Sequence, residues 1–259
     1  MAREVHCRAS IARALAALGD LDSAQAALAQ THDLARRIPS SGWSWERIHV
    51  EGARDALTLA SGEDWAGTQA VLDEIMSTED PVPRLARACL SAACARTAAH
   101  LGQSARAIAL LALPIQALSR APAWALNYTR VASDTAETLW LLDRRDHLRS
   151  VEAALRLKAL PADFRFPMMD LRLSLARLCA VDGRVEEAAH WFGQARSALE
   201  EQGARPLRAI TDFDQALMHA RLGRRASARP LLNAAASQFQ RIGMTGWLRR
   251  AGQLATLLP

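Results

Sequence analysis

The chain is poor in aromatic residues and has no long apolar run. Aromatic side chains make up 5% of its 259 residues, while hydrophobic residues together make up 50%, most of them Ala and Leu. This balance excludes a disordered polypeptide and favours helices, since Ala and Leu lose little rotamer entropy in a helix. No apolar run approaches the roughly 20 residues that a membrane-spanning helix needs. The first ten residues carry several charges and no apolar signal segment. We therefore expect a soluble, cytoplasmic protein with no membrane partner.

Cysteine is scarce, and the cysteines are not spaced as the ligands of a metal site would be. The four cysteines, Cys7, Cys89, Cys94 and Cys179, lie in predicted helices. None forms a C-x-x-C pair, and no histidine follows at the spacing of a metal site. We expect buried thiols in a reducing compartment rather than disulfides, and neither a bound metal nor a cofactor.

Lysine is almost absent, since Lys158 is the only one, so the net charge of +5 comes from arginine. This bias is typical of a GC-rich bacterial genome. A basic balance permits contact with nucleic acid. The arginines are scattered in ones and twos, however, so we expect most of them on solvated helix faces.

Sequence motifs of enzymes are missing as well. The chain contains no H-E-x-x-H, G-x-S-x-G or G-x-G-x-x-G, and no G-x-x-x-x-G-K-[ST] phosphate loop. Its seven histidines are spread along the whole chain. The segment from Asp143 to His147 superficially resembles a metal cluster, but an arginine adjoins each carboxylate, which favours a solvated turn with local ion pairs. We predict a non-enzymatic protein without catalytic residues.

A two-residue step recurs along the chain at nearly constant intervals of 43, 40, 41, 40 and 40 residues. Each step lies between two Ala/Leu-rich amphipathic stretches and predicts the tight turn of a helical hairpin. A fixed period in this range is typical of stacked repeat arrays. The six steps are Leu18-Gly19, Ser61-Gly62, Leu101-Gly102, Leu142-Asp143, Asp182-Gly183 and Leu222-Gly223.

The repeats predict an all-α fold, a right-handed α-solenoid of about six hairpins that fills residues 1–259 as a single domain. A capping helix over residues 245–258 is expected to cover the last hairpin. Asp143 tolerates left-handed backbone less well than glycine, so the fourth turn is expected to be longer. Pro114 and Pro230 lie inside predicted second helices, and each implies a kink or a shifted start. The hairpins are expected at residues 4–37, 44–77, 83–119, 122–159, 163–202 and 206–242.

The segment Gly183 to Phe192 resembles the turn and second helix of a tetratricopeptide repeat, as do residues 18–24 and 222–228. In that family a glycine opens the turn, and a small alanine follows five residues later where helices cross closely. The period near 40 exceeds the family's usual 34 and implies longer helices. The matching alanines here are Ala24, Ala107, Ala188 and Ala228.

Long repeats that end in Gly-Met-x-Gly-Trp, here residues 243–247, are similar to the C-terminal arrays of large bacterial signalling ATPases. These include maltose-regulator-type transcription activators and ATPase-linked nucleotide cyclases. The resemblance implies a linked ATPase or DNA-binding domain in a longer parent chain, and it leaves open whether Met1 is the native start.

In tetratricopeptide arrays the first helices line a concave groove, so the resemblance implies that residues six before each turn face a ligand. Arginine offers a planar donor fork that matches carboxylates and phosphates, and aromatic anchors dominate binding hot spots. We hypothesise a groove that binds an acidic peptide through its arginines, with Trp140 as the apolar anchor. The alternative is ordinary solvated arginine and a packed tryptophan. The groove set consists of Arg13, Arg96, Arg130, Glu137, Trp140, Asp170 and Arg177. Alanine at both Arg96 and Arg177 is expected to weaken partner capture without lowering the melting temperature.

The turns also differ in charge along the chain. Such an asymmetry predicts head-to-tail contacts or an oriented partner, although turns are usually charged because they are solvated. Early turns carry Asp20, Asp22, Glu63 and Asp64, and later turns carry Arg144, Arg145, Arg184, Arg224 and Arg225.

These features favour a protein-interaction or ligand-sensing scaffold, the regulatory repeat module of a bacterial signalling or transcription-regulatory protein. Its partner would be a protein or an acidic peptide segment. The alternative is a basic α-solenoid that binds nucleic acid, which stacking aromatics and repeated basic stripes would support. A helical enzyme with a central cavity is a third class, and it would need convergent acidic or histidine residues.

Overall fold

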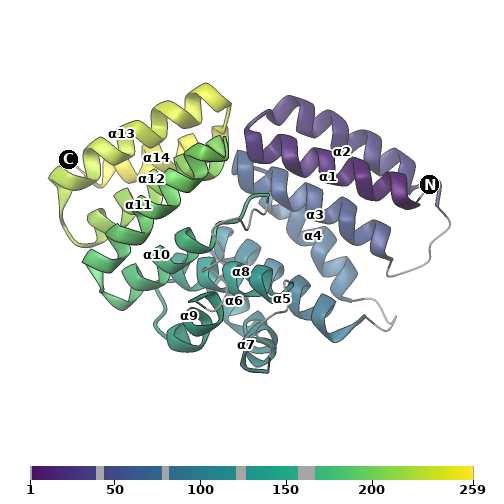
Figure 1. The fold of residues 1–259 in the computed structure, drawn as a ribbon, viewed down its shortest axis with the longest axis horizontal. Coiled ribbons are helices and arrows are strands. Elements are labelled where there is room, and N and C mark those ends of the chain that lie inside the picture. Colours follow the sequence, from purple (N-terminus) through teal and green to yellow (C-terminus); the bar gives the residue numbers. More distant parts are fainter. Residues whose placement is uncertain (1, 39–43, 78–81, 121–126, 157–166, 259) are drawn as a thin grey trace. The chain divides into compact units, whose positions relative to one another are not determined.

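The computed structural model describes residues 2–38, 44–77, 82–120, 127–156 and 167–258, and this part of the chain is all-helical, without strands (Figure 1). The prediction of an all-α protein is confirmed. None of the described helices combines the length and apolarity that crossing a membrane requires. The helices are α1 (Ala2–Leu18), α2 (Leu21–Ala35), α3 (Trp45–Ser61), α4 (Trp65–Met76), α5 (Arg84–His100), α6 (Ser104–Leu110), α7 (Ala112–Ser119), α8 (Asn127–Leu141), α9 (Leu148–Arg156), α10 (Leu171–Asp182), α11 (Val185–Glu201), α12 (Arg205–Arg221), α13 (Arg225–Ile242) and α14 (Thr245–Thr256).

All six predicted turns fall between consecutive helices, and each contains a residue with left-handed backbone. Five of these residues are glycines with φ between 69° and 82°, which suits a residue without a Cβ atom. In the fourth turn Asp143 adopts φ 51°, and α9 begins only at Leu148. The expected longer turn is therefore present. The glycines are Gly19, Gly62, Gly102, Gly183 and Gly223.

The alanine five residues after each of four turn glycines is buried. Ala24 is 1% exposed, and Ala107, Ala188 and Ala228 are fully buried. A small side chain at this position lets neighbouring helices approach closely, as the repeat pattern predicts. Near Pro114 the expected second helix is divided into α6 and α7 at Leu111, which confirms the predicted interruption. Pro230, by contrast, lies inside α13, which begins at Arg225 directly after the turn, so the start of this helix is not shifted.

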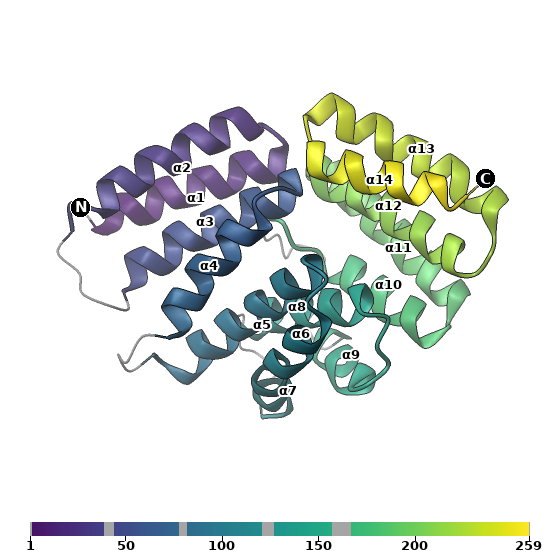
Figure 2. The ribbon, with the colours of Figure 1, turned by 180° about the vertical axis from the view of Figure 1, so that it is seen from behind.

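The chain divides into two compact units, and unit 1 consists of residues 1–64 and 194–259. In unit 1, α1 packs against α2 and α3, and α12 packs against α13. Helices from the two ends of the sequence also meet there, because α12 contacts α1, and α14 contacts α3 as well as α13 (Figure 2). The sequence predicts α14 only as a cover for the last hairpin, and its contact with α3 is an additional feature of the structure.

The contact between α14 and α3 is close and specific. Trp247 is 2% exposed, and its indole N–H donates a hydrogen bond of 2.8 Å to the carbonyl of Leu59 at the end of α3. Its ring lies 5.7 Å from that of Phe213 on α12. A Cβ atom added at Gly246 would lie 2.1 Å from the carbonyl oxygen of Gly62, so only glycine fits at this crossing.

Unit 2 consists of residues 65–193 and carries the predicted first helices α5, α8 and α10. Helix α5 packs on α8, and α8 packs on α10, so the three first helices follow one another in sequence order. The shorter helices α6 and α9 pack on α5 and α8 respectively. This order brings four members of the groove set into one region of unit 2.

Candidate functional site

The first helices of unit 2 share a buried network of charged side chains. One part of it centres on Asp134 of α8, which is 4% exposed. Arg96 of α5 lies 3.3 Å from one oxygen of this carboxylate, and Arg130 donates to the other at 2.9 Å. Burial and the Asp134 charge raise the pKa of the neighbouring Cys89 thiol to about 11, so this thiol stays protonated at neutral pH.

The other part of the network centres on Glu137, one helical turn further along α8. Arg177 of α10 donates to its carboxylate at 2.9 Å, and the His100 ring nitrogen lies 2.8 Å from the other oxygen. The His100 ring is stacked on Trp65 at 3.8 Å between ring centres. Burial alone would raise the pKa of Glu137, but Arg177 and His100 outweigh burial and hold it far below its ordinary value. Glu137 is therefore ionised, and its charge is compensated inside unit 2.

These contacts change the interpretation of the groove set. Arg96 and Arg177 are 1% and 4% exposed and already have carboxylate partners, so neither presents its guanidinium to an incoming peptide. Removing one member of a buried ion pair leaves its partner uncompensated, which costs about 3–5 kcal/mol. Because both positions are in buried ion pairs, we now expect alanine at both to lower the melting temperature rather than leave it unchanged.

The remaining members of the groove set lie apart from this network or serve the fold. Trp140 is 1% exposed, so its ring is packed within unit 2, as the alternative interpretation held. Asp170 caps α10, since its carboxylate accepts hydrogen bonds from the backbone N–H of Arg172 and Leu173 at 2.8 and 3.2 Å. Arg13 belongs to unit 1, where it is half-buried and donates to Ser10 at 3.0 Å.

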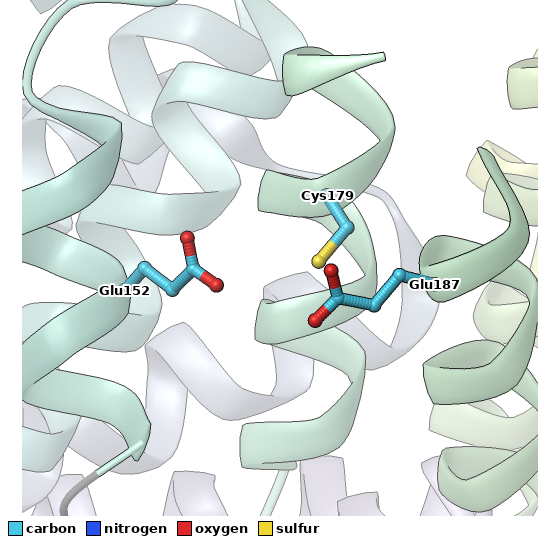
Figure 3. A group of neighbouring side chains, drawn as sticks. All are labelled: Glu152, Cys179 and Glu187. Carbon is cyan, nitrogen blue, oxygen red and sulfur yellow. The ribbon is translucent and has the colours of Figure 1, made fainter. Parts of the chain in front are cut away.

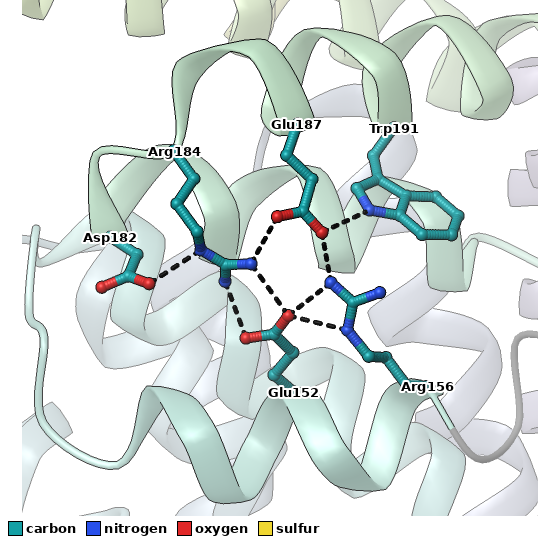
Figure 4. Close-up of polar contacts among 6 residues, drawn as sticks. All are labelled: Glu152, Arg156, Asp182, Arg184, Glu187 and Trp191. Atoms are coloured by element: carbon teal, nitrogen blue, oxygen red, sulfur yellow. Dashed lines mark hydrogen bonds and ion pairs between the residues drawn. The ribbon is translucent and has the colours of Figure 1, made fainter.

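A second charged cluster in unit 2, which the sequence analysis missed, joins α9 to the turn before α11 (Figure 4). Arg184 donates to Glu152 at 2.7 Å, to Glu187 at 2.6 Å and to Asp182 at 2.8 Å. Arg156 donates to Glu152 at 2.8 Å and also pairs with Glu187. The Arg156 guanidinium lowers the pKa of Glu187. The cluster links successive repeats by alternating charges.

Glu152, Cys179 and Glu187 come together in the same place, and their possible ligand atoms all lie within 4.8 Å of one another (Figure 3). Such a group resembles a metal site. Both carboxylates, however, are already bound by Arg184 and Arg156, whose positive charges oppose a cation. Burial raises the pKa of the Cys179 thiol to about 12, which disfavours the thiolate that metals bind. The geometry therefore favours a structural cluster over a metal centre.

The structure also bears on two smaller expectations, the solvated turn at residues 143–147 and the burial of the cysteines. In the segment from Asp143 to His147 every residue is exposed, and Arg144 pairs with Asp146, so the interpretation as a solvated turn is confirmed. Cys94 and Cys179 are buried, as expected for structural thiols. Cys7 is exposed, so for this residue the expectation of burial is wrong.

A hollow of about 670 Å³ opens between α2 and α3 of unit 1. Leu28 and Leu57 contribute apolar surface to it, and charged side chains contribute the rest. Most of these charges are already paired: Arg36 donates to Asp33 at 2.6 Å, and Arg54 lies 3.8 Å from Asp64. The hollow therefore offers no concentrated charge that would select a small ionic ligand.

No protein-family model matches this sequence, and no curated protein matches it. The functional argument therefore depends on the residues and contacts described above.

Proposed function

We propose that the chain is a non-enzymatic helical-repeat scaffold, a right-handed α-solenoid of the tetratricopeptide type, that binds a protein partner. The observation that carries the proposal is the repeated unit itself. Left-handed turns recur about every 40 residues, and the alanine that follows is buried in four of the six repeats. Repeats of this kind generate extended binding surfaces.

The distribution of charge supports a scaffold over a catalyst. The two clusters of titratable groups described above are neutralised internally, because each carboxylate in them contacts an arginine or a histidine. Groups held in this way stabilise helix packing and are not poised to exchange protons with a substrate. A partner would then bind through exposed side chains of the repeats.

We further propose that this scaffold regulates a domain linked to it in a bacterial signalling or transcription-regulatory protein. The resemblance of residues 243–247 to the end of such arrays supports this setting. A partner that binds one conformation of the scaffold better than another would increase the population of that conformation and so change the state of the linked domain.

Affinity capture from the source cell, followed by calorimetric titration of the purified partner, tests the proposal. A single protein that binds saturably, and still binds after nuclease treatment, is the expected result. Recovery of nucleic acid alone would favour the alternative, a basic solenoid that binds nucleic acid. In that case the affinity would fall steeply with added salt.

A further inference from the structure

The last 45 residues of the chain carry charge of one sign only. Residues 215–259 contain seven arginines and neither aspartate nor glutamate. The preceding 214 residues hold 25 Lys and Arg against 27 Asp and Glu, so the whole positive excess of the chain lies in this final stretch. It forms the end of α12 together with α13 and α14, all within unit 1.

Four of these arginines, Arg221, Arg224, Arg225 and Arg229, surround the turn that joins α12 to α13, and we call them the turn arginines. All four are exposed. Arg225 and Arg229 lie four residues apart on α13 and therefore share one face of that helix. Arg224 occupies the position just before the helix, so the group is concentrated at one end of the hairpin.

Three of the turn arginines, Arg224, Arg225 and Arg229, differ from the other arginines of comparable position. Arg184 also follows a turn glycine directly, but it binds three carboxylates. Within unit 1, Arg249 pairs with Glu63, and Arg250 lies 5.0 Å from the centre of the Trp247 ring. By contrast, Arg224, Arg225 and Arg229 pair with no carboxylate of the described residues.

This concentration of charge works against the stability of unit 1. Like charges four residues apart on a helix repel each other, and the first turn of a helix favours negative rather than positive side chains. Burial does not offset this cost for Arg224, Arg225 and Arg229, because their side chains are exposed. A role in binding a partner explains why these arginines are concentrated here, whereas a role in stabilising the fold does not.

The apolar residue between these arginines indicates the kind of partner. Leu222 is 45% exposed, and it lies in the turn between Arg221 and Arg224. The aromatic side chains nearest in sequence, Phe213 and Phe239, are 7% and 0% exposed and offer no face for stacking a base. An apolar spot framed by guanidinium groups suits a protein segment better than a nucleic acid.

We propose that the turn arginines and Leu222 form the docking surface for an acidic protein segment. Its carboxylates would bind the arginine forks, and an apolar side chain would cover Leu222. This inference depends on the proposed scaffold function and identifies the surface and the partner class for it.

Random-peptide display against the purified chain tests this assignment, with two matched variants. The first is R224E/R225E/R229E. The control, R3E/R37E/R241E, changes the net charge by the same amount at exposed arginines elsewhere in unit 1. The first variant is expected to fold and to melt no lower than the wild type, since it places acidic residues at the N-cap and at the first position of α13.

We expect the wild type and the control to enrich acidic peptides that contain a large apolar residue. The best of these peptides should bind R224E/R225E/R229E at least about tenfold more weakly. The assignment would be overturned if the selected peptides lacked acidic residues, or if the control variant lost peptide affinity to the same extent. It would also be overturned if R224E/R225E/R229E lost affinity only for oligonucleotides. If a partner or peptide binds R224E/R225E/R229E undiminished, this surface is refuted and the scaffold function stands. If the wild type selects no peptide and captures no protein, the docking surface and the scaffold function are both refuted.

Discussion

Substituting Glu137 by glutamine should destabilise the chain far more than an ordinary surface change. The substitution keeps the shape of the side chain and removes the negative charge between Arg177 and His100. Arg177 is only 4% exposed, so its charge would remain buried after losing this carboxylate. The expected loss is about 3–5 kcal/mol. A typical domain has about 5–15 kcal/mol of stability in total, so the loss is a large fraction of it.

Urea unfolding followed by circular dichroism measures this loss, and a double-mutant cycle isolates the pair. Arg177→Met alone should cost a similar amount, because it leaves Glu137 buried without its guanidinium. The double variant E137Q/R177M should cost less than the sum by about 2 kcal/mol, since neither charge is then left unpaired. Glu186→Gln on α11 is the control, because its carboxylate is exposed.

Two results would refute this reasoning. One is a loss below about 1 kcal/mol for E137Q, which is the size expected of a surface ion pair. The other is additivity of the two single variants within about 0.5 kcal/mol, which would show that the groups do not interact.

Three further predictions concern packing, pH and metal. Gly246→Ala should cost about 1–3 kcal/mol, because its methyl group would meet the backbone of Gly62 at the end of α3. Gly252→Ala, which has open space in the same helix, should be neutral or stabilising in the same melting experiment, and equal effects of the two substitutions would refute the crossing. Burial, a neighbouring histidine and a neighbouring arginine hold the pKa of His49 below 6.5, and burial also lowers that of His219. The unfolded chain then binds more protons than the folded chain, so the urea midpoint should fall as pH drops below about 6.5, and His49→Gln should reduce that fall; an unchanged slope would contradict the assignment. Zinc should not raise the melting temperature, and Cys179→Ser should respond to zinc as the wild type does; stabilisation that depends on Cys179 would show that a metal displaces the arginines.

The turns and the small residues beside them could be predicted because their causes are local. A left-handed residue at the end of a helix favours glycine, so Gly183 and its equivalents are visible in the sequence. The same local reasoning located Ala188 at a close helix crossing. These features repeat with the period, and each occurrence supports the others.

The contact of α14 with α3 could not be predicted in this way. It joins Trp247 to Leu59 across 188 residues, and no local pattern encodes a pairing of that range. Tertiary packing alone decides it.

The groove set shows an intermediate case. Counting back from the turns correctly grouped Arg96, Glu137 and Arg177 on adjacent helices, but it missed Asp134 and His100. The signal that could have revealed the buried pairs is complementary charge one repeat apart, since Arg177 and Glu137 are separated by 40 residues. Stacked repeats bring such positions together, so opposite charges at that spacing predict an internal ion pair rather than a binding surface.

Hydrogen exchange of the chain, with and without a selected acidic peptide, tests the central claim most directly. The claim is that charges on the first helices of unit 2 maintain the fold, while exposed arginines at the α12–α13 turn bind the partner. We predict that the peptide protects amides at the α12–α13 turn and leaves α5, α8 and α10 unchanged. Protection along α5, α8 and α10, with none at that turn, would contradict the account.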